Sequence, residues 1–287
     1  MKLAAVVVLY NPNDQVIENI KSYIDYVDTV YAVDNSSSDN ESRFNDPKIV
    51  YIANGENKGI AYALNAGAKQ AVKDGFEWLL TMDQDSSFNG DGINKMKDFI
   101  LDCRDNPRSK YSYKKLGLIT PFHRTKYNAD VEPETVDSPA VVMTSGNIIS
   151  LKAYEEIGGF KDWMFIDAVD FDYCLNLRDY GYDIWRLGFV ELTHNLGDMV
   201  TKKIGSKQYM SSNHSPIRRY YLVRNRHYFL DMYRERYPDY CNAEKRCTRR
   251  EVKEIILCEK QKFKKLFAML QGYIDYKRGV KGAKPKH

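Results

Sequence analysis

The sequence lacks the features that mark several common classes of protein. No apolar segment approaches the roughly 18–20 residues that a membrane-spanning helix needs. The five cysteines form no CxxC pair or other zinc-like spacing, and their odd number fits a reducing cytoplasm better than a disulfide scaffold. There are no internal repeats and no P-loop or GxGxxG motif. These absences predict a soluble, cytoplasmic protein that is at most peripheral to a membrane.

The chain has enough apolar residues for a folded core, and its charge is unevenly placed. With 287 residues, 43% of them hydrophobic, it is expected to be globular rather than disordered. Residues 243–287 hold 14 Lys and Arg against 5 Asp and Glu, although the whole chain carries a net charge of only +4. Such asymmetry indicates a basic segment that meets something acidic. No nucleic-acid recognition motif accompanies it, so nucleic acid is not expected as a partner.

The first 90 residues alternate between strand-like and helix-like patterns. An almost unbroken apolar run at residues 3–10 is typical of a strand covered on both faces. Short strand patterns recur at "TVYAVD", "KIVYIAN" and "EWLLTMD", and a Gly-marked loop leads into a helix from Ile60. This alternation predicts an α/β fold with a mostly parallel central sheet flanked by helices. Polar residues follow the strand ends, where open α/β sheets bind ligands.

The remainder of the chain is predicted to mix strands with longer helices. We expect a helix over residues 91–104, strands at "LGLITPF" and "AVVMTSGNIISL" (the second antiparallel or at an edge), a helix at "DFDYCLNLRDYG" and a strand at "YDIWRL". Residues 200–215 lack periodicity and predict a flexible loop. A helix from Pro216 to about Tyr237 and an amphipathic helical segment follow, and the final "KRGVKGAKPKH" is expected to fray.

Two polar motifs follow the predicted strands in the first half. Asp34 and the serines after it fit an Asx/Ser turn that caps a helix, or a carboxylate that accepts the imide N–H of a pyrimidine base. Asn57, Lys58 and Gly59 lie at a helix N-terminus, where free N–H groups attract phosphate. A helix start with a packing glycine explains the second motif equally well.

Acidic residues form two further candidate sites. Asp83 and Asp85 follow a buried strand, so they can hold a divalent cation that bridges a diphosphate, or only cap the next turn. Asp167, Asp170 and Asp172 precede a helix, where N-capping explains one or two of them and a general base is the alternative. His194 is either structural or a ligand of a metal already held by acids.

Together these motifs resemble the family 2 glycosyltransferases with the GT-A fold. The resemblance covers roughly residues 4–230 and rests on the order and separation of "VVVLYNP", "VDNSS", "NKGIAYALNAG", "MDQDS", "SGNIIS", "DFDYCLNLRDYGY" and "HNLGD". Within that family, "AVDNSS", "GIAYALN", "MDQDS" and "YYLVRN" look most like bacterial rhamnosyltransferases that build O-antigen or capsule polysaccharide.

The resemblance implies a role for each matching residue. Asp34 would contact the uracil or thymine ring with support from Asn35, and the nucleotide sugar would be flanked by Asn57, Lys58, Gly59, Asn65 and Asp83. Asp83 and Asp85 would hold Mg²⁺ or Mn²⁺, with His194 completing the metal site. Arg224 and Asn225 would reach the diphosphate.

The resemblance also implies the catalytic base and the reaction. Asp170 aligns with the acid of the family's "ED" motif, but Val169 replaces the residue before it, so Asp167 and Asp172 stay as alternatives. The implied reaction is inverting and metal-dependent, moving L-rhamnose from dTDP-rhamnose to a hydroxyl of a growing, lipid-linked surface polysaccharide. Transfer of galactose, glucose or GlcNAc from a UDP-sugar is the alternative, and a non-catalytic nucleotide-sugar-binding protein is the rival from another class.

The predicted domain organisation places the basic segment outside the catalytic fold. Residues 1–240 form the GT-A domain, with a nucleotide-sugar-binding half at 1–115 and an acceptor-binding half at 116–240. Residues 241–287 form a basic amphipathic helical extension. This extension packs on the catalytic domain, lies on the cytoplasmic face of an anionic inner membrane, or makes an oligomer contact.

Overall fold

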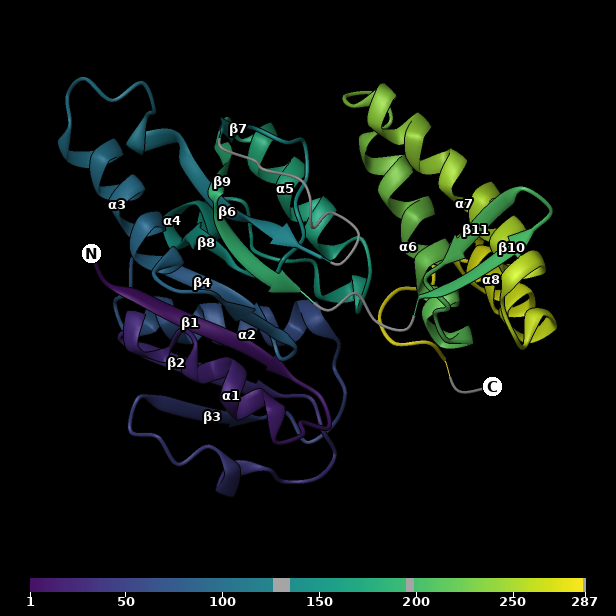
Figure 1. The fold of residues 1–287 in the computed structure, drawn as a ribbon, viewed down its shortest axis with the longest axis horizontal. Helices are drawn as coiled ribbons and strands as arrows, with labels where there is room; N and C mark the ends of the chain where they lie inside the picture. The colour runs from purple at the N-terminus through teal and green to yellow at the C-terminus, as the bar shows by residue number, and fades with distance from the viewer. Residues whose placement is uncertain (126–134, 195–198, 286–287) are drawn as a thin grey trace. The chain divides into compact units, whose positions relative to one another are not determined.

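The computed structural model describes residues 1–125, 135–194 and 199–285, and the chain divides into two compact units (Figure 1). The first unit comprises Met1–Asp162 and Asp170–Asn195. The second comprises Trp163–Val169 and Leu196–His287. The short segment 163–169 therefore leaves the first unit and returns to it, whereas the predicted boundaries at residues 115 and 240 stay predictions.

The first unit is built on a mixed sheet whose N-terminal part is parallel. Its strands lie in the order β3-β2-β1-β4-β8-β6-β9-β5, with β7 beside β9. Strands β1, β2, β3 and β4 run parallel, as the strand–helix alternation predicts. The elements of this part are β1 (Leu3–Leu9), α1 (Gln15–Lys21), β2 (Thr29–Asp34), β3 (Ile49–Ala53), α2 (Ile60–Lys73) and β4 (Trp78–Asp83).

The rest of the sheet adds antiparallel strands to this parallel half. Strand β8 (Asn147–Ser150) runs antiparallel between β4 and β6 (Leu116–Arg124), which confirms its predicted direction. Strand β9 (Asp183–His194) is parallel to β6 and antiparallel to β5 (Ser86–Phe88) and β7 (Val136–Asp137). The helices here are α3 (Gly92–Asp105), α4 (Leu151–Glu156) and α5 (Val169–Asp179), and short 3-10 helices lie at Ile24–Tyr26, Glu41–Arg43, Tyr113–Lys115 and Asp162–Met164.

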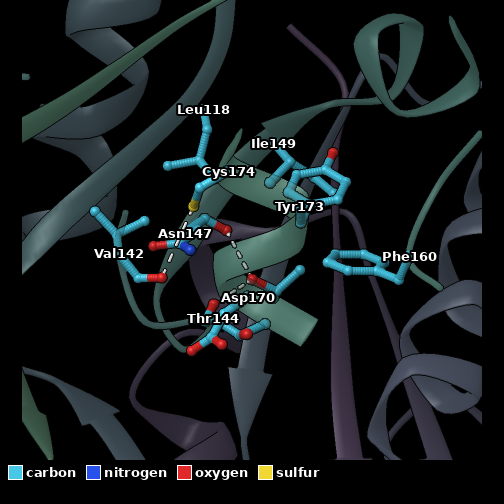
Figure 2. Close-up of a pocket in the computed structure, with 10 residues that line it drawn as sticks. Leu118, Val142, Thr144, Asn147, Ile149, Phe160, Asp170, Tyr173 and Cys174 are labelled. Carbon is cyan, nitrogen blue, oxygen red and sulfur yellow. Dashed lines mark hydrogen bonds between the residues drawn. The ribbon is translucent and has the colours of Figure 1, made fainter. Parts of the chain in front are cut away.

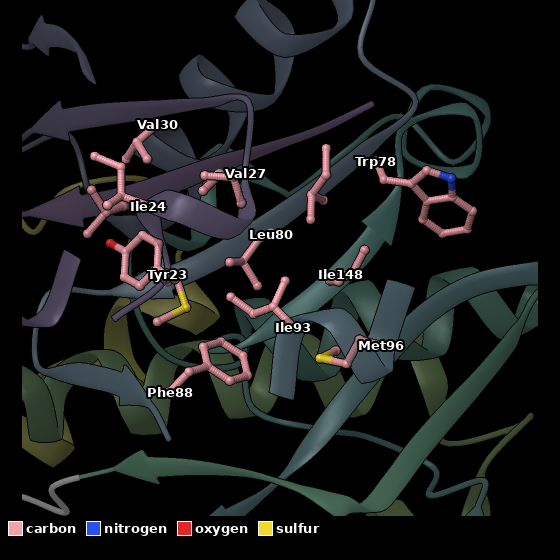
Figure 3. Close-up of a cluster of buried hydrophobic side chains, with 14 of the residues drawn as sticks. Tyr23, Ile24, Val27, Val30, Trp78, Leu80, Phe88, Ile93, Met96 and Ile148 are labelled. Carbon is pink, nitrogen blue, oxygen red and sulfur yellow. The ribbon is translucent and has the colours of Figure 1, made fainter. Parts of the chain in front are cut away.

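The core of the first unit lies between the sheet and its covering helices (Figure 3). Strand β1 is buried almost throughout, which explains its unbroken apolar run. On the side of α2, small residues allow a close approach: a Cβ added to Gly67 would lie 2.3 Å from Val6 Cγ2. This tight contact fixes the N-terminus of α2 at the carboxyl edge of the sheet, where the candidate site lies.

The described part of the second unit contains three helices, a β-hairpin and the segment 163–169. The helices are α6 (Pro216–Tyr233), α7 (Pro238–Cys258) and α8 (Lys262–Lys277). Ser215 caps α6 by accepting a hydrogen bond from Arg218 N, and Pro216 occupies the first helical turn, where its missing N–H costs nothing. Residue Gln261 has a left-handed backbone (φ 54°) that separates α8 from α7. A Cβ on Gly272 of α8 would lie 2.4 Å from Tyr220 O of α6, so these two helices pack backbone to backbone.

The predicted flexible loop at residues 200–215 is wrong. Strands β10 (Val200–Ile204) and β11 (Lys207–Ser211) form an antiparallel hairpin whose two-residue turn contains Gly205 at φ 60°. Gly-Ser between two strands is a hairpin signal, although the region as a whole shows no periodicity. The hairpin is anchored through Ser211, whose hydroxyl donates to the buried Glu259; the same carboxylate pairs with Arg219 (2.6 Å) and Lys265 (2.5 Å).

Two further observations concern the C-terminal segment. The expected fraying is wrong as far as residue 285, because Gly282 N donates to Trp163 O (2.7 Å) and Lys284 N donates to Tyr221 Oη (2.7 Å). Among the described residues, no helix combines the length and the apolar character that crossing a bilayer requires.

Candidate active site

The carboxyl ends of three parallel strands bring the predicted nucleotide and metal residues to one edge of the sheet. Asp34 at the end of β2 lies beside Leu9 of β1, and Asp83 at the end of β4 lies beside Val8. Because β1 is the strand between them, the two aspartates are two strand spacings apart, about 10 Å along the sheet. A nucleoside diphosphate is long enough to bridge such a separation.

The Asp34 carboxylate is held by four donors. Its Oδ1 accepts from Ser36 N (2.8 Å) and Ser36 Oγ (2.5 Å), and its Oδ2 accepts from Tyr51 Oη (2.7 Å) and Asn40 Nδ2 (2.8 Å). Burial alone would raise the pKa of Asp34, but these hydrogen bonds outweigh it and lower the pKa below its ordinary value. The group is thus ionised and buried, and protein donors fix its orientation at the strand end.

Residues 57–59 are tied to the end of β2 through Asn35. The Asn35 side chain donates to Gly59 O (3.1 Å) and accepts from Asn54 Nδ2 (2.9 Å). Asn57 Oδ1 accepts from Gly59 N (3.0 Å), and Gly59 has a φ of 90° that favours glycine as it leads into α2. The structure therefore brings the predicted Asn35, Asn57, Lys58 and Gly59 together, at the N-terminus of a helix.

The acidic pair Asp83 and Asp85 is positioned by the residue between them and by the segment before β8. The Gln84 side chain accepts a hydrogen bond from Tyr10 N (2.8 Å) and donates one to Tyr10 O (3.2 Å). The backbone carbonyl of Gln84 accepts from Asn19 Nδ2 (2.8 Å). Asp83 N donates to Ser145 Oγ (3.0 Å). These contacts lock the turn, with Asp83 partly buried and Asp85 exposed.

His194 lies beside this turn in the sheet. It ends β9 and is in register with Ser86, the residue that follows Asp85. The His194 side chain lies outside the described part of the structure. Among the described side chains, no three His, Cys, Asp or Glu residues cluster as a complete metal site. Two carboxylates one residue apart nevertheless fit a hard cation such as Mg²⁺ or Mn²⁺ that takes further oxygen ligands from a diphosphate.

Asp170 lies in the first turn of α5 and lines a water-sized cavity of about 10 Å³ (Figure 2). Thr81 of β4 lines the same cavity, and its hydroxyl donates to Thr144 O (2.5 Å). Since side chains two residues apart share a face of a strand, Asp83 lies on the face of β4 that Thr81 presents to Asp170. The cavity is too small to hold a sugar. Its lining comprises Thr81, Leu118, Val142, Thr144, Asn147, Ile149, Phe160, Asp170, Tyr173 and Cys174.

The two alternative bases have different surroundings. Asp172 is buried, and both of its oxygens accept from Lys161 Nζ at 2.7 Å. Asp167 belongs to the second unit, where its Oδ1 accepts from Arg218 Nε (3.2 Å). Burial raises the pKa of Asp167 in spite of the nearby arginines. Both oxygens of Asp172 are therefore engaged in an ion pair with a lysine.

Two predicted donor-binding residues are buried in structural contacts. Asn65 donates to Phe160 O (2.7 Å) and to Asp162 Oδ1 (2.5 Å), so it anchors the segment that leads to residue 163. Arg224 is fully buried, and its guanidinium donates to the carbonyls of Gly282 (2.7 Å), Met164 (3.3 Å) and Trp163 (3.4 Å). These contacts give both residues a positioning role.

The segment just before Asp170 has an unusual backbone. Phe165, Asp167 and Ala168 have φ values of 67°, 64° and 63°, a region that costs a non-glycine residue roughly 1–2 kcal/mol. Asn225 of α6 holds this segment through its Nδ2, which lies 2.6 Å from Met164 O and 2.6 Å from Ile166 O. We call residues 163–168 the clamped segment. Strain of this kind persists only where the surroundings impose it.

Sequence reasoning missed several residues that shape the site. Gln84 and Ser145 orient the acidic turn, while Asn40 and Tyr51 orient Asp34. Gln84 and Ser145 stand inside the quoted motifs "MDQDS" and "SGNIIS", so their position was a usable signal. Asn40 and Tyr51 had no such signal. The contact of Asn40 depends on the path of the loop after β2, and Tyr51 reaches Asp34 from the neighbouring strand β3.

The parallel half-sheet and the acids at its carboxyl edge define the class of this protein: the chain belongs to glycosyltransferase family 2. The family model for glycosyl transferase family 2 matches residues 4–108. The chain is similar to the dTDP-rhamnosyl transferase RfbF of Shigella flexneri, with 30% identity over 243 residues that cover 77% of each chain.

Solved structures share the fold, which confirms the predicted GT-A architecture. GalNAc-T7 with UDP, GalNAc and Mn²⁺ matches with a TM-score of 0.59 at 11% identity over 98% of this chain. This chain spans only 58% of the length of GalNAc-T7. Residues 1–349 of S. aureus TarS match with a TM-score of 0.54 at 15% identity, covering 97% of this chain and 73% of that one. The same TarS fragment in complex with UDP-GlcNAc matches with a TM-score of 0.52 at 14% identity, with the same coverage.

Proposed function

We propose that the protein transfers L-rhamnose from dTDP-rhamnose, with inversion, to a hydroxyl group of a growing surface polysaccharide. The observation that carries the choice of sugar is the 30% identity to a dTDP-rhamnosyl transferase across most of both chains. The acceptor we propose is lipid-linked, and the enzyme works at the cytoplasmic face of the inner membrane. The acidic edge of the sheet supports a nucleotide-sugar donor, because it offers one carboxylate (Asp34) for the nucleobase and a pair (Asp83 and Asp85) for a cation.

The donor lies along the carboxyl edge of the sheet in this proposal. Asp34 accepts the imide N–H of the thymine ring, and the N-terminus of α2 at Gly59 faces the negative diphosphate. A divalent cation, Mg²⁺ or Mn²⁺, held by Asp83, Asp85 and His194 would neutralise the charge that develops on the leaving nucleoside diphosphate. Gln84 and Ser145 keep the two acids in place.

Asp170 acts as the general base on the acceptor. Its carboxylate takes the proton of the acceptor hydroxyl as that oxygen attacks the anomeric carbon. The new glycosidic bond forms on the face opposite the breaking carbon–oxygen bond, and the electron pair leaves with the diphosphate. One displacement of this kind inverts the configuration without a covalent intermediate.

Substitution of Asp170 tests the catalytic assignment. Asp170→Asn keeps the size of the side chain and removes its basicity, so turnover should fall by roughly 10²–10⁴-fold. Affinity for the donor, measured by calorimetry with dTDP-rhamnose, should stay close to wild type. Asp25→Asn, at an exposed carboxylate outside the site, is the matched control. Near-normal turnover of Asp170→Asn would show that Asp170 is not the general base and would assign that role to Asp167 or Asp172.

A donor panel separates the sugars and the alternatives. dTDP-rhamnose is compared with UDP-galactose, UDP-glucose and UDP-GlcNAc, each with metal and with EDTA. A UDP-sugar is the second candidate because GalNAc-T7 and TarS were solved with UDP and with UDP-GlcNAc. Turnover with a UDP-hexose alone would overturn the rhamnose assignment, and undiminished turnover in EDTA would overturn the metal role of Asp83 and Asp85. If one or more of these donors bind but no sugar is transferred to any acceptor, the protein is a non-catalytic nucleotide-sugar-binding protein.

A further inference from the structure

Helix α8 has one face that is packed within the second unit and one face that is not. Its buried face comprises Lys265, Ala268, Met269, Gly272 and Asp275. This face meets α6, because Ala268 of α8 forms a small hydrophobic cluster with Tyr220 and Tyr221 of α6. Packing against α6 therefore explains the residues on one face of α8, the helix shown in yellow in Figure 1.

The opposite face carries a continuous apolar stripe. Phe263, Phe267, Leu270 and Ile274 follow one another at steps of four, three and four residues, which places them on one side of a helix. The ring of Phe263 is 89% exposed and that of Phe267 is 61% exposed, and Leu270 and Ile274 are exposed as well. Single exposed apolar residues are common, but four in a row along one helix mark a surface that meets another apolar phase.

The border of this stripe is cationic. Lys262 and Lys264 flank Phe263, and Lys277 and Arg278 lie at the other end of the helix, all four exposed. The only acidic residue between positions 260 and 285 is Asp275, which is buried and accepts a hydrogen bond from Tyr220 Oη (2.8 Å). The exposed face is thus apolar in the middle and positive around it.

We propose that this face of α8 binds the surface of an anionic phospholipid bilayer. Phe263, Phe267, Leu270 and Ile274 enter the boundary between headgroups and acyl chains, and the lysines and Arg278 contact the negative headgroups. A helix with aromatic and aliphatic residues on one face and cations around it lies in the plane of such an interface. The proposal is independent of the sugar that the enzyme transfers.

A second copy of this chain fits the face less well. The steps of four and three residues would also suit a short coiled-coil seam. In a pair of α8 helices, however, the basic borders would face each other, and no exposed acid on the helix could compensate them. The charge pattern complements an anionic surface and opposes self-association.

Vesicle co-sedimentation with the full chain tests the proposal. The chain must stay intact, because residues 282 and 284 bond to Trp163 and Tyr221 and a truncation would damage the second unit. Binding is compared on phosphatidylcholine vesicles, on vesicles that also contain phosphatidylglycerol, and on the latter at high salt. We expect binding only with phosphatidylglycerol, and weaker binding at high salt because salt screens the headgroup attraction.

Two variants divide the apolar and cationic contributions. Phe263→Ser with Phe267→Ser should reduce vesicle affinity by at least about tenfold, since two exposed rings lose their burial in lipid. Lys262→Glu with Lys264→Glu should remove the preference for anionic lipid. Phe189→Ser, at an exposed phenylalanine of β9, should bind as wild type. All variants should keep the wild-type melting temperature, because the replaced groups are exposed.

Three results would overturn the proposal. The first is no sedimentation of the wild-type chain with anionic vesicles. The second is wild-type affinity of the Phe263/Phe267 variant. The third is light scattering that shows a dimer which this variant converts to a monomer, because the face would then be an interface between copies. Neither the assay nor its outcomes depend on turnover, so failure here leaves the glycosyl transfer to be judged separately.

Discussion

The side chain of Asn225 holds the segment of the second unit that immediately precedes the proposed base, Asp170, in the chain. Its Nδ2 has two hydrogens and lies 2.6 Å from Met164 O and 2.6 Å from Ile166 O, within the clamped segment. Each such bond is worth about 0.5–1.5 kcal/mol net; Met164 O keeps Arg224 Nη2 (3.3 Å) and Ile166 N (2.8 Å) as donors, whereas Ile166 O loses its bond to Asn225, and a buried carbonyl without a donor costs about 1–3 kcal/mol. We therefore expect Asn225→Ala to lower the free energy of unfolding by about 2–4 kcal/mol.

The activity of this variant should fall as well, for a separate reason. The clamped segment runs directly into Asp170, and it contains three residues whose strained backbones cost roughly 3–6 kcal/mol in total. Without Asn225 the strain is free to relax and to displace Asp170. Because a displacement of about 1 Å can cost ~10²-fold in rate, kcat should fall by at least about tenfold at a urea concentration where the protein is fully folded. Donor affinity should not change.

Urea unfolding and initial rates on the same preparations provide the measurement. Asn225→Asp keeps the size of the side chain and the Oδ1 that accepts from Arg224 Nε (3.0 Å), but it cannot donate, so it should be as damaging as Ala. Asn176→Ala removes a single bond to Ile157 O (3.0 Å) and is the matched control, with an expected loss of about 1 kcal/mol and unchanged kcat. A wild-type unfolding midpoint together with wild-type kcat in Asn225→Ala would refute the reasoning.

Three further substitutions probe other contacts. Asp172→Asn leaves the Lys161 ammonium without its carboxylate and should lower the free energy of unfolding by about 2–3 kcal/mol, as measured in urea. Gly272→Ala places a Cβ 2.4 Å from Tyr220 O and should cost about 2–3 kcal/mol; an unchanged melting temperature would contradict the close packing of α6 and α8. Burial and two nearby arginines lower the pKa of His214 to about 4, whereas the unfolded chain takes up this proton near pH 6.5. Stability should therefore be lost as the pH falls from 6.5 to 4, and His214→Gln should remove about 1–2 kcal/mol of that loss in unfolding curves across this range.

The first half of the fold was predictable because its signals are local. Strands β1 to β4 are short, apolar and separated by turn residues, and α2 begins at Ile60, where the sequence predicts it. Parallel strands place their carboxyl ends at the same edge of the sheet, so the neighbourhood of Asp34 and Asp83 followed from the pattern. What the pattern could not supply is the set of donors around Asp34, because Tyr51 reaches it from another strand.

The second unit was harder to predict because its contacts join distant parts of the chain. Arg224 resembles a phosphate-binding residue in sequence, and only the fold shows that carbonyl oxygens of Trp163, Met164 and Gly282 surround its guanidinium. The left-handed backbones of Phe165, Asp167 and Ala168 also escaped prediction, since Phe and Ala do not favour that conformation. The roles of the predicted site residues stay predictions until the variants are measured.

The path of the clamped segment has a consequence for how the protein is made. Residues 1–85, which form the proposed donor-binding edge, leave the ribosome early, but the clamped segment is held by Asn225 and Gly282. About 110 further residues separate Asp170 from Gly282, which takes roughly 5–20 s at typical rates of synthesis. During that interval the nascent chain can form the proposed donor site but lacks the contacts that hold the strained segment before Asp170, the proposed general base. We expect a ribosome-bound chain that ends before residue 282 to bind donor and leave it unconsumed, so the order of synthesis itself delays catalysis until the second unit exists.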